Sequence, residues 1–258
     1  LFIYNASLPL NKFKNDYIQM ITPKISLRTN PGNMVDYSTV SKYLDTNNIF
    51  SPNRLSINDS FETGNSVTIG LDYIKKNLSD QNKLFEANLA MIFRDKVEKK
   101  IPSSYSINKK NSNLFGNINF KTSDFYNIGY NFSLDNKLEK FERHSFSGDV
   151  KFRKFVTGFN FLKERGSVGN ASLLENTFKY EFDNKNFLSF KTRRNRSINL
   201  TEFYDLIYEY KNDCLSAGIK YKKTFYEDRE LKPTEDLFFS ITIFPLTTYE
   251  KKVNDLYQ

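Results

Sequence analysis

The chain has 258 residues, with 38 Lys and Arg against 30 Asp and Glu, and its formal net charge is +8. Its mean hydropathy is −0.58, and no run approaches the roughly 18 apolar residues of a membrane helix, which excludes a helical membrane protein. Aromatic residues make up 16% of the chain, which argues against disorder, and 10 Gly with 7 Pro exclude a collagen-like protein.

Apolar and polar residues alternate with a period of two along most of the chain, which is typical of a sheet with two unlike faces. The alternation is clear at 66–73, 126–133 and 204–210. In chain order, the pattern predicts strands at 17–28, 41–56, 66–75, 83–95, 113–121, 125–134, 138–146, 149–163, 172–183, 187–195, 201–211, 214–226 and 236–246, with 1–9 as a further candidate.

The predicted strands are long, at about 9–14 residues, whereas strands of soluble proteins are mostly about 5–6 residues. A tilted strand needs about 9–11 residues to cross a bilayer. Long alternating strands without intervening helices therefore predict an all-β fold, an antiparallel transmembrane β-barrel of about 12–14 strands. Its apolar face would contact lipid and its polar face would line the interior. The alternative is a soluble sandwich or solenoid, whose core would draw more on Val, Ile and Leu than on Phe and Tyr.

Connection lengths test the barrel independently, because outer-membrane barrels alternate short periplasmic turns with longer outer loops. Short turns are predicted at 122–124, 147–148, 183–185 and 212–213, and longer connections at 96–112, 164–171, 196–200 and 227–235. The alternation fails at 135–137 and 76–82. The short turns lie on the side where the last strand ends, which places the C-terminus in the periplasm.

One Cys and one His leave few options for common site chemistry. A structural zinc site needs about four Cys or His ligands, and Cys214 has no second cysteine for an internal disulfide. A Ser-His-Asp triad would have to use His144, around which no nucleophile-elbow pattern occurs. We therefore expect no metal, cofactor or catalytic residue, and we interpret His144 as an ordinary strand or turn residue.

Charged residues fall on the polar face of the predicted strands. Asp205 and Glu209 share that face on one strand, so basic residues of neighbouring strands would face them inside a barrel. We expect a luminal charged face with a ladder of ion pairs, made by Lys191, Arg193, Asp205, Glu209, Lys220 and Lys222. A basic interior would attract phosphorylated lipids or sugars. Nucleic-acid binding competes as an interpretation of the pI of about 9.2, but no nucleic-acid motif frames the Lys and Arg residues, so we expect no such partner.

Two stretches carry a resemblance to one family. The first is Asn-Ile-Phe-Ser-Pro-Asn-Arg-Leu at 48–55, followed by Asp59, Glu62, Gly64 and 70–73. The second is Tyr-Asp-Leu-Ile-Tyr-Glu-Tyr-Lys-Asn-Asp-Cys at 204–214, followed by Phe225, Arg229, Lys232, Pro233 and 243–246. Together they resemble the C-terminal barrel region of the LptD family of lipopolysaccharide-assembly proteins, while the middle of the chain matches only by pattern.

The resemblance implies a non-enzymatic transport protein of the Gram-negative outer membrane. Members of the family form a very large barrel with a lipoprotein plug, LptE, inside it. A periplasmic jelly-roll domain at the N-terminus receives lipopolysaccharide from a periplasmic Lpt bridge. The lipid leaves through a lateral opening between the first and last strands, and the sugar passes through the lumen. The implied partners are lipopolysaccharide, an LptE-like plug, and the bridge through an N-terminal domain absent from this sequence.

The resemblance also implies roles for particular residues. Cys214 matches the family's C-terminal cysteine, which is joined to an N-terminal cysteine, and it follows a turn assigned to the periplasm, where disulfides persist. Leu215 stands where members often carry a second cysteine. Pro245 would weaken the seam of the gate, because proline removes a ladder donor. The lateral-gate strand is expected to contain Phe238, Ser240, Thr242, Phe244 and Pro245.

The family's barrel has about twice the strands predicted here, so residues 1–258 are expected to be the C-terminal part of an outer-membrane barrel. Residues 247–258 would form a short periplasmic tail. A general porin of about 12–14 strands, complete as given, is the alternative, and a barrel enzyme is a weaker one. In a closed porin the strand near residue 17, or near residue 1, would pair with 236–246. In a fragment these edges would stay apart.

Overall fold

The computed structural model describes all residues except 40–42, 57–60, 81, 123–124, 226–233 and 254–258. It confirms the all-β antiparallel fold, with 15 strands and two short 3-10 helices, η1 (Ser103–Tyr105) and η2 (Gly166–Val168). No helix of the described part is long and apolar enough to span a bilayer. Of the residues that carry the family resemblance, Asp59, Arg229, Lys232 and Pro233 lie outside the described residues.

Neighbouring strands pair in the order β1-β3-β4 and onward to β15, with β2 also paired to β3. The chain divides into two compact units. The first unit holds β1 (Phe2–Ser7), β2 (Leu10–Phe13), β3 (Tyr17–Asn30), β4 (Gly64–Asn77), β5 (Lys83–Arg94), β6 (Leu114–Thr122) and most of β7 (Tyr126–Leu134). The second holds most of β9 (Phe155–Glu164), then β10 (Ser172–Glu181), β11 (Asn186–Asn195), β12 (Leu200–Lys211), β13 (Leu215–Thr224), β14 (Thr234–Ile243) and β15 (Thr247–Lys252). β8 (Phe141–Phe152) contributes to both units.

The second unit has a sheet with one apolar and one polar face, because successive side chains of a strand point to opposite sides. Tyr204, Leu206 and Ile219 on the apolar face are 36%, 41% and 49% exposed. Phe178, Phe190 and Tyr204 form a stacked row across three strands, with centroid distances of 6.4 and 5.9 Å. These rings are not buried against a second layer of sheet, as they would be in a soluble sandwich. An apolar face left open over several strands fits lipid contact.

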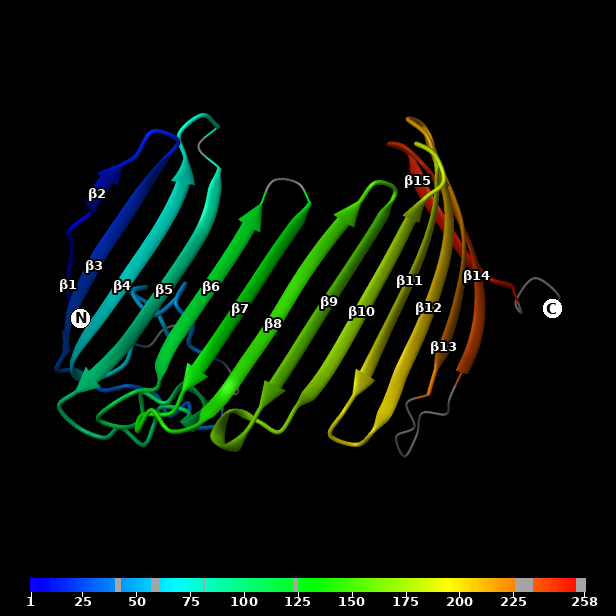
Figure 1. Ribbon diagram of the computed structural model, residues 1–258. Helices are drawn as coiled ribbons and strands as arrows, with labels where there is room; N and C mark the ends of the chain where they lie inside the picture. The colour runs from blue at the N-terminus through cyan, green and yellow to red at the C-terminus, as the bar shows by residue number, and fades with distance from the viewer. Residues whose placement is uncertain (40–42, 57–60, 81, 123–124, 226–233, 254–258) are drawn as a thin grey trace. The chain divides into compact units, whose positions relative to one another are not determined.

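The first unit differs, because a chain segment packs on one face of its sheet. We call residues 31–63, which connect β3 to β4, the insert. Its apolar side chains Leu44, Ile49 and Leu55 are 3%, 0% and 2% exposed. They form one core with Ile92 of β5 and Phe115 of β6. Figure 1 shows the described parts of the insert beside β4, β5 and β6.

The strand predicted at 41–56 is wrong, since residues 43–56 form turns within the insert. The Asp45 side chain accepts hydrogen bonds from the backbone N–H groups of Asn47 (2.9 Å) and Asn48 (3.0 Å), and such contacts compete with strand pairing. Pro52 also lacks the N–H that a ladder needs. The apolar residues of 41–56 therefore indicated a packed loop and not a strand.

One predicted turn also lies elsewhere. The turn expected at 147–148 lies inside β8, and the chain reverses instead at Arg153 and Lys154, where Arg153 has a φ of 52°. Ser-Gly can occupy a strand interior as well as a turn, so the dipeptide alone did not place the reversal. The observed strand bounds also change the two connections at which the alternation of short and long failed. The connection expected to be long, 135–140, is longer than the next one, the turn at 153–154, and the connection expected to be short, 78–82, is shorter than the insert that precedes it. Both exceptions to the alternation of connection lengths are thereby removed.

The C-terminal region requires a third correction. β14 ends at Ile243, and Phe244 and Pro245 lie in a turn, where Leu246 N–H donates to the Ile243 carbonyl at 2.8 Å. Residues 247–252 then form β15, paired with β14, so they are not a free tail. Pro245 was expected within the terminal strand of the gate, whereas it lies in the turn between β14 and β15. Two short strands, β2 and β15, are thus missing from the predicted count of about 12–14.

The pairing expected of a closed porin, of β3 or β1 with β14, is not formed among the described strands. β3 pairs with β1 and β2 on one edge and with β4 on the other. β14 lies between β13 and β15. Both edges of each strand are therefore occupied, and β3 cannot pair with β14.

We predict that Gly70→Val displaces the insert. A Cβ at Gly70 of β4 would lie 2.7 Å from Cζ of Phe50 in the insert, and overpacking of this kind costs about 1–3 kcal/mol. The variant should expose the insert to trypsin while the strands keep their circular dichroism. The double variant Gly70→Val with Phe50→Ala removes the ring and should regain protection. Unchanged protection in the single variant would contradict this packing.

Candidate functional site

The insert is fixed to the sheet by a buried charged cluster in the first unit. Arg28 of β3, Ser66 of β4 and Arg94 of β5 lie directly opposite one another in the strand register. Their exposed fractions are 5%, 5% and 6%, and Arg54 and Glu62 of the insert are each 1% exposed. The side chains of this row point to the face that the insert covers. The residues before and after them on each strand point to the opposite face, because successive side chains of a strand alternate.

Arg54 and Glu62 form the centre of the cluster. Arg54 Nε donates to Glu62 Oε2 at 2.8 Å and Arg54 Nη2 donates to Glu62 Oε1, so the fork and the carboxylate pair in a bidentate manner. Arg54 also donates to Ser66 Oγ and Thr68 Oγ1 of β4, both at 2.9 Å. The two insert residues are therefore bonded to each other and to the sheet beneath them.

Two further guanidiniums face the same carboxylate. Arg94 Nη1 lies 3.3 Å from Glu62 Oε1, and Arg28 Nε lies 3.8 Å from it. Arg28 also donates to the carbonyl oxygens of Ser51 at 2.7 Å and Pro52 at 2.9 Å, which belong to the insert. We call Arg28, Arg54, Arg94 and Glu62 the arginine clamp, because one carboxylate joins the insert to β3 and β5.

Electrostatics keep Glu62 ionised in spite of its burial. Burial raises the pKa of this carboxyl, but the Arg54 guanidinium, and after it Arg28 and Arg94, outweigh burial and hold the pKa below its ordinary value. Removing one partner of a buried ion pair costs about 3–5 kcal/mol, since the other charge stays buried without compensation. The clamp is thus a stable attachment only while Glu62 carries its charge.

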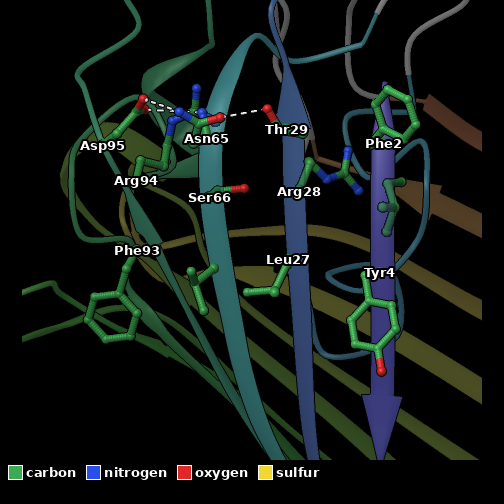
Figure 2. A pocket seen from close by; sticks show the side chains of 12 residues that line it. Phe2, Tyr4, Leu27, Arg28, Thr29, Asn65, Ser66, Phe93, Arg94 and Asp95 are labelled. Carbon is green, nitrogen blue, oxygen red and sulfur yellow. Dashed lines mark hydrogen bonds between the residues drawn. The ribbon is translucent and has the colours of Figure 1, made fainter.

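A cavity of about 700 Å³ lies on the other face of the same strands, over β1, β3, β4 and β5. Its apolar wall is a row in register, Tyr4, Leu27, Val67 and Phe93, and Figure 2 shows Tyr4, Leu27 and Phe93 along it. Its polar rim is a chain of hydrogen bonds: Thr29 Oγ1 donates to Asn65 Oδ1 at 2.6 Å, and Asn65 Nδ2 donates to Asp95 Oδ2 at 2.9 Å. An apolar wall with a polar rim suits a hydrocarbon chain that ends in a polar group.

The six residues of the predicted luminal charged face all lie on the polar face of the second unit. Lys220 Nζ is 3.9 Å from Asp205 Oδ2, so this pair forms as expected. Lys191 pairs instead with Glu175 at 3.0 Å, and Arg193 pairs with Glu202. The remaining two residues have other neighbours: Glu209 accepts from Ser216 Oγ at 2.7 Å, and Lys222 lies opposite Asp205 and Asp236. That this face lines a lumen stays a prediction.

The residues assigned to the gate divide between a strand and a turn. Phe238, Ser240 and Thr242 belong to β14 and share the polar face, because Phe238 lies opposite Lys220. Phe244 and Pro245 lie in the following turn. Since β14 is flanked by β13 and β15, it is not the border of the sheet.

Cys214 is exposed in the tight turn between β12 and β13. Asn212 Oδ1 accepts from the backbone N–H groups of Cys214 (3.0 Å) and Leu215 (2.8 Å), which fixes this turn. Phe244 N–H donates to the Cys214 carbonyl at 2.9 Å, so the cysteine lies at the same end of the unit as the turn after β14. His144 lies in β8 and stacks on Phe141 at 5.8 Å.

Sequence reasoning missed the arginine clamp, although Arg54 and Glu62 were among the residues of the family resemblance. A usable signal was present. Arg28 and Arg94 fall on polar-face positions at the ends of two long strands, and Glu62 comes just before a third. Without the strand register, however, nothing indicated that the three lie together.

The chain was compared with known proteins. A family model described as LptD, LPS transport system D, matches residues 5–201. No curated protein matches the chain. Among solved structures, a triple mutant of the Rhodopseudomonas blastica porin is 7% identical, with a TM-score of 0.42 over 96% of this chain and 93% of the porin. A double mutant of the same porin is also 7% identical, with a TM-score of 0.41 and the same coverage. Scores this low leave the family match as the informative result.

We predict that acid releases the insert. The depressed pKa of Glu62 means that its ion pairs contribute fully above the ordinary carboxyl pKa of 4.5, and that this contribution is lost as the pH falls through the lower pKa. Protection of the insert from pepsin should therefore decline as the pH falls below about 4.5. Glu62→Gln should give the low-pH cleavage pattern at neutral pH with trypsin. Equal protection of the wild type and the variant at neutral pH would refute the prediction.

Proposed function

This chain belongs to the LptD family, LPS transport system D, of the Gram-negative outer membrane, and from that premise we propose that it inserts lipopolysaccharide into the outer leaflet. No covalent step is needed for this function, since the substrate is moved and not altered. Lipopolysaccharide has an apolar part of acyl chains and a polar part of phosphorylated sugar. A path for it must offer separate surfaces to the two parts.

The single observation that carries the proposal is the contrast between the two faces of the sheet. In the second unit, rings and aliphatic side chains such as Tyr204 and Leu206 remain exposed on one face. The opposite face carries the ion pairs Lys220–Asp205 and Lys191–Glu175. Acyl chains would follow the first face and hydrated sugar the second. A sheet that only supported a soluble core would bury its apolar face.

The polar face suits a sugar and its phosphates because both signs of charge alternate on it. Asp236 pairs with Lys252, and Glu209 accepts from Ser216 at 2.7 Å, so acidic and hydroxyl groups lie among the lysines. Carboxylates and hydroxyls bond sugar hydroxyls, and lysines attract phosphate. Such a surface would hold the substrate weakly at many points, which allows it to move on.

The lateral opening would border β15 and not β14. Among the described strands, β15 pairs with β14 alone, and its residues Thr247–Glu250 are exposed. An unpaired edge inside a bilayer is costly unless another strand or a substrate meets it. Phe238, Ser240 and Thr242 would then lie one strand behind the opening. Pro245 would act at the turn that begins β15.

Two protein partners complete the proposal. An LptE-like lipoprotein would plug the lumen against the polar face, and a periplasmic Lpt bridge would deliver the substrate through an N-terminal domain. The exposed thiol of Cys214 supports a link to such a domain, because the turn that carries it is tight and accessible.

The function is tested in a strain depleted of its own copy of this protein. We expect the full-length gene to restore lipopolysaccharide at the cell surface, measured by antibody binding to intact cells. A general porin would instead restore only the uptake of small solutes. Restored solute uptake with lipopolysaccharide retained inside the cell would contradict the proposal.

The link through Cys214 is tested by electrophoresis. We predict that the full-length protein migrates faster without reductant than with it, because a disulfide to an upstream cysteine keeps the denatured chain compact. Cys214→Ser should abolish the difference, whereas Ser216→Ala, a nearby control, should leave it unchanged. Identical migration of the wild type with and without reductant would exclude the disulfide.

A further inference from the structure

The arginine clamp contains more positive than negative charge. Three guanidiniums of Arg28, Arg54 and Arg94 face the one carboxylate of Glu62, and all four residues are more than nine-tenths buried. An ion pair made only to fasten the insert would need one arginine for one carboxylate, because each additional buried charge is costly. Arg28 and Arg94 also hold the insert by donating to its carbonyl oxygens, at Ser51, Pro52 and Thr63, but these neutral acceptors leave the three positive charges of the clamp facing a single negative one.

Several donors of the clamp are not used. Nε of Arg28 and both Nε and Nη1 of Arg94 are buried and have no hydrogen-bond acceptor within the described part of the chain. Arg94 Nη1 contacts Glu62 Oε1 at 3.3 Å only as an ion pair. Glu62 offers two oxygens, and Arg54 already bonds both of them. An anion with more oxygens than a carboxylate would satisfy donors that Glu62 leaves free.

The chemistry of that anion follows from the arrangement of the donors. Guanidinium forks bind carboxylate and phosphate with the same bidentate geometry. Arg28 and Arg94 lie opposite each other across β4, with Ser66 between them, and Arg54 closes the site from the insert. Hydroxyls of Ser66 and Thr68 stand beside the guanidiniums and can donate as well. The number and placement of these donors suit a tetrahedral oxyanion.

We propose that Arg28, Arg54 and Arg94 form a phosphate-binding site that Glu62 occupies from within the chain, and that a phosphate monoester group takes the place of the carboxylate. The inference rests on the proposed function in one respect: lipopolysaccharide is the phosphorylated substrate that would supply the group. Displacement of Glu62 by the phosphate would break the ion pairs that join the insert to β3 and β5, while the Arg28 hydrogen bonds and the apolar core of the insert remain. Gly64, the first residue of β4, has a φ of 89°, a conformation that glycine adopts without strain where the insert joins the strand.

The site is tested by chemical rescue in the full-length protein in detergent. Glu62→Ala removes the internal anion and leaves the three arginines without a partner. We expect this variant to unfold at a lower temperature than the wild type, and inorganic phosphate to raise its melting temperature more than chloride at equal ionic strength. The matched control is Glu86→Ala, because Glu86 also lies in the β4–β5 pair but forms its ion pair with Lys83 at 2.8 Å, outside the clamp. Phosphate and chloride should act equally on the control.

An equal effect of phosphate and chloride on Glu62→Ala would overturn the proposal. Should Glu62→Ala fail to fold, Glu62→Gln keeps the shape of the side chain, and equilibrium dialysis with radiolabelled inorganic phosphate replaces the melting curve. At least tenfold tighter binding by this variant than by the wild type is expected, and equal binding would refute the site.

The source of the phosphate is distinguished by two further probes. Lipopolysaccharide in detergent micelles should compete with inorganic phosphate for Glu62→Gln, and lipopolysaccharide stripped of its phosphates should not. Equal competition by both preparations would refute the assignment of this site to the phosphates of the substrate. Rescue by inorganic phosphate needs no transport, so it can succeed even where the surface-lipopolysaccharide experiment fails. The two proposals therefore fail independently.

Discussion

The structure depends on one constraint, that a strand in a bilayer must bond its backbone to neighbouring strands and present every second side chain to lipid. This constraint explains why Phe178, Phe190 and Tyr204 of the second unit lie on one face, where Phe178 and Tyr204 remain exposed. It also explains why the ion pairs Lys220–Asp205 and Lys191–Glu175 lie on the alternate positions, on the polar face. The two surfaces that lipopolysaccharide transport needs are therefore a direct consequence of the alternation.

The same alternation made most of the fold predictable. The strands predicted at 83–95, 113–121 and 187–195 agree with β5, β6 and β11 to within one residue at each end. Strand identity depends on local periodicity, which a sequence displays directly. The prediction failed where local residues had two possible uses. Ser147 and Gly148 suited a turn or a strand, and Pro245 ended one strand without ending the sheet.

The insert shows a different limit of sequence reasoning. Its buried residues Leu44, Ile49 and Leu55 are apolar because they pack across the sheet, and their spacing follows neither a strand nor a helix. The arginine clamp was even harder to predict from the sequence. Arg28 and Arg94 are far apart in the chain, and only the register through Ser66 brings them together. Long-range register is set by the pairing of whole strands, and no local motif encodes it.

Lipid contact of the apolar face is the central claim, and the chain is well suited to a direct measurement because it contains no Trp. Phe190→Trp and Ser189→Trp place a single indole on the apolar and the polar face of β11, respectively. In vesicles of lipids with brominated acyl chains, the fluorescence of the tryptophan at position 190 should be strongly quenched and that at position 189 much less. Equal quenching at the two positions would contradict the assignment of the apolar face to lipid.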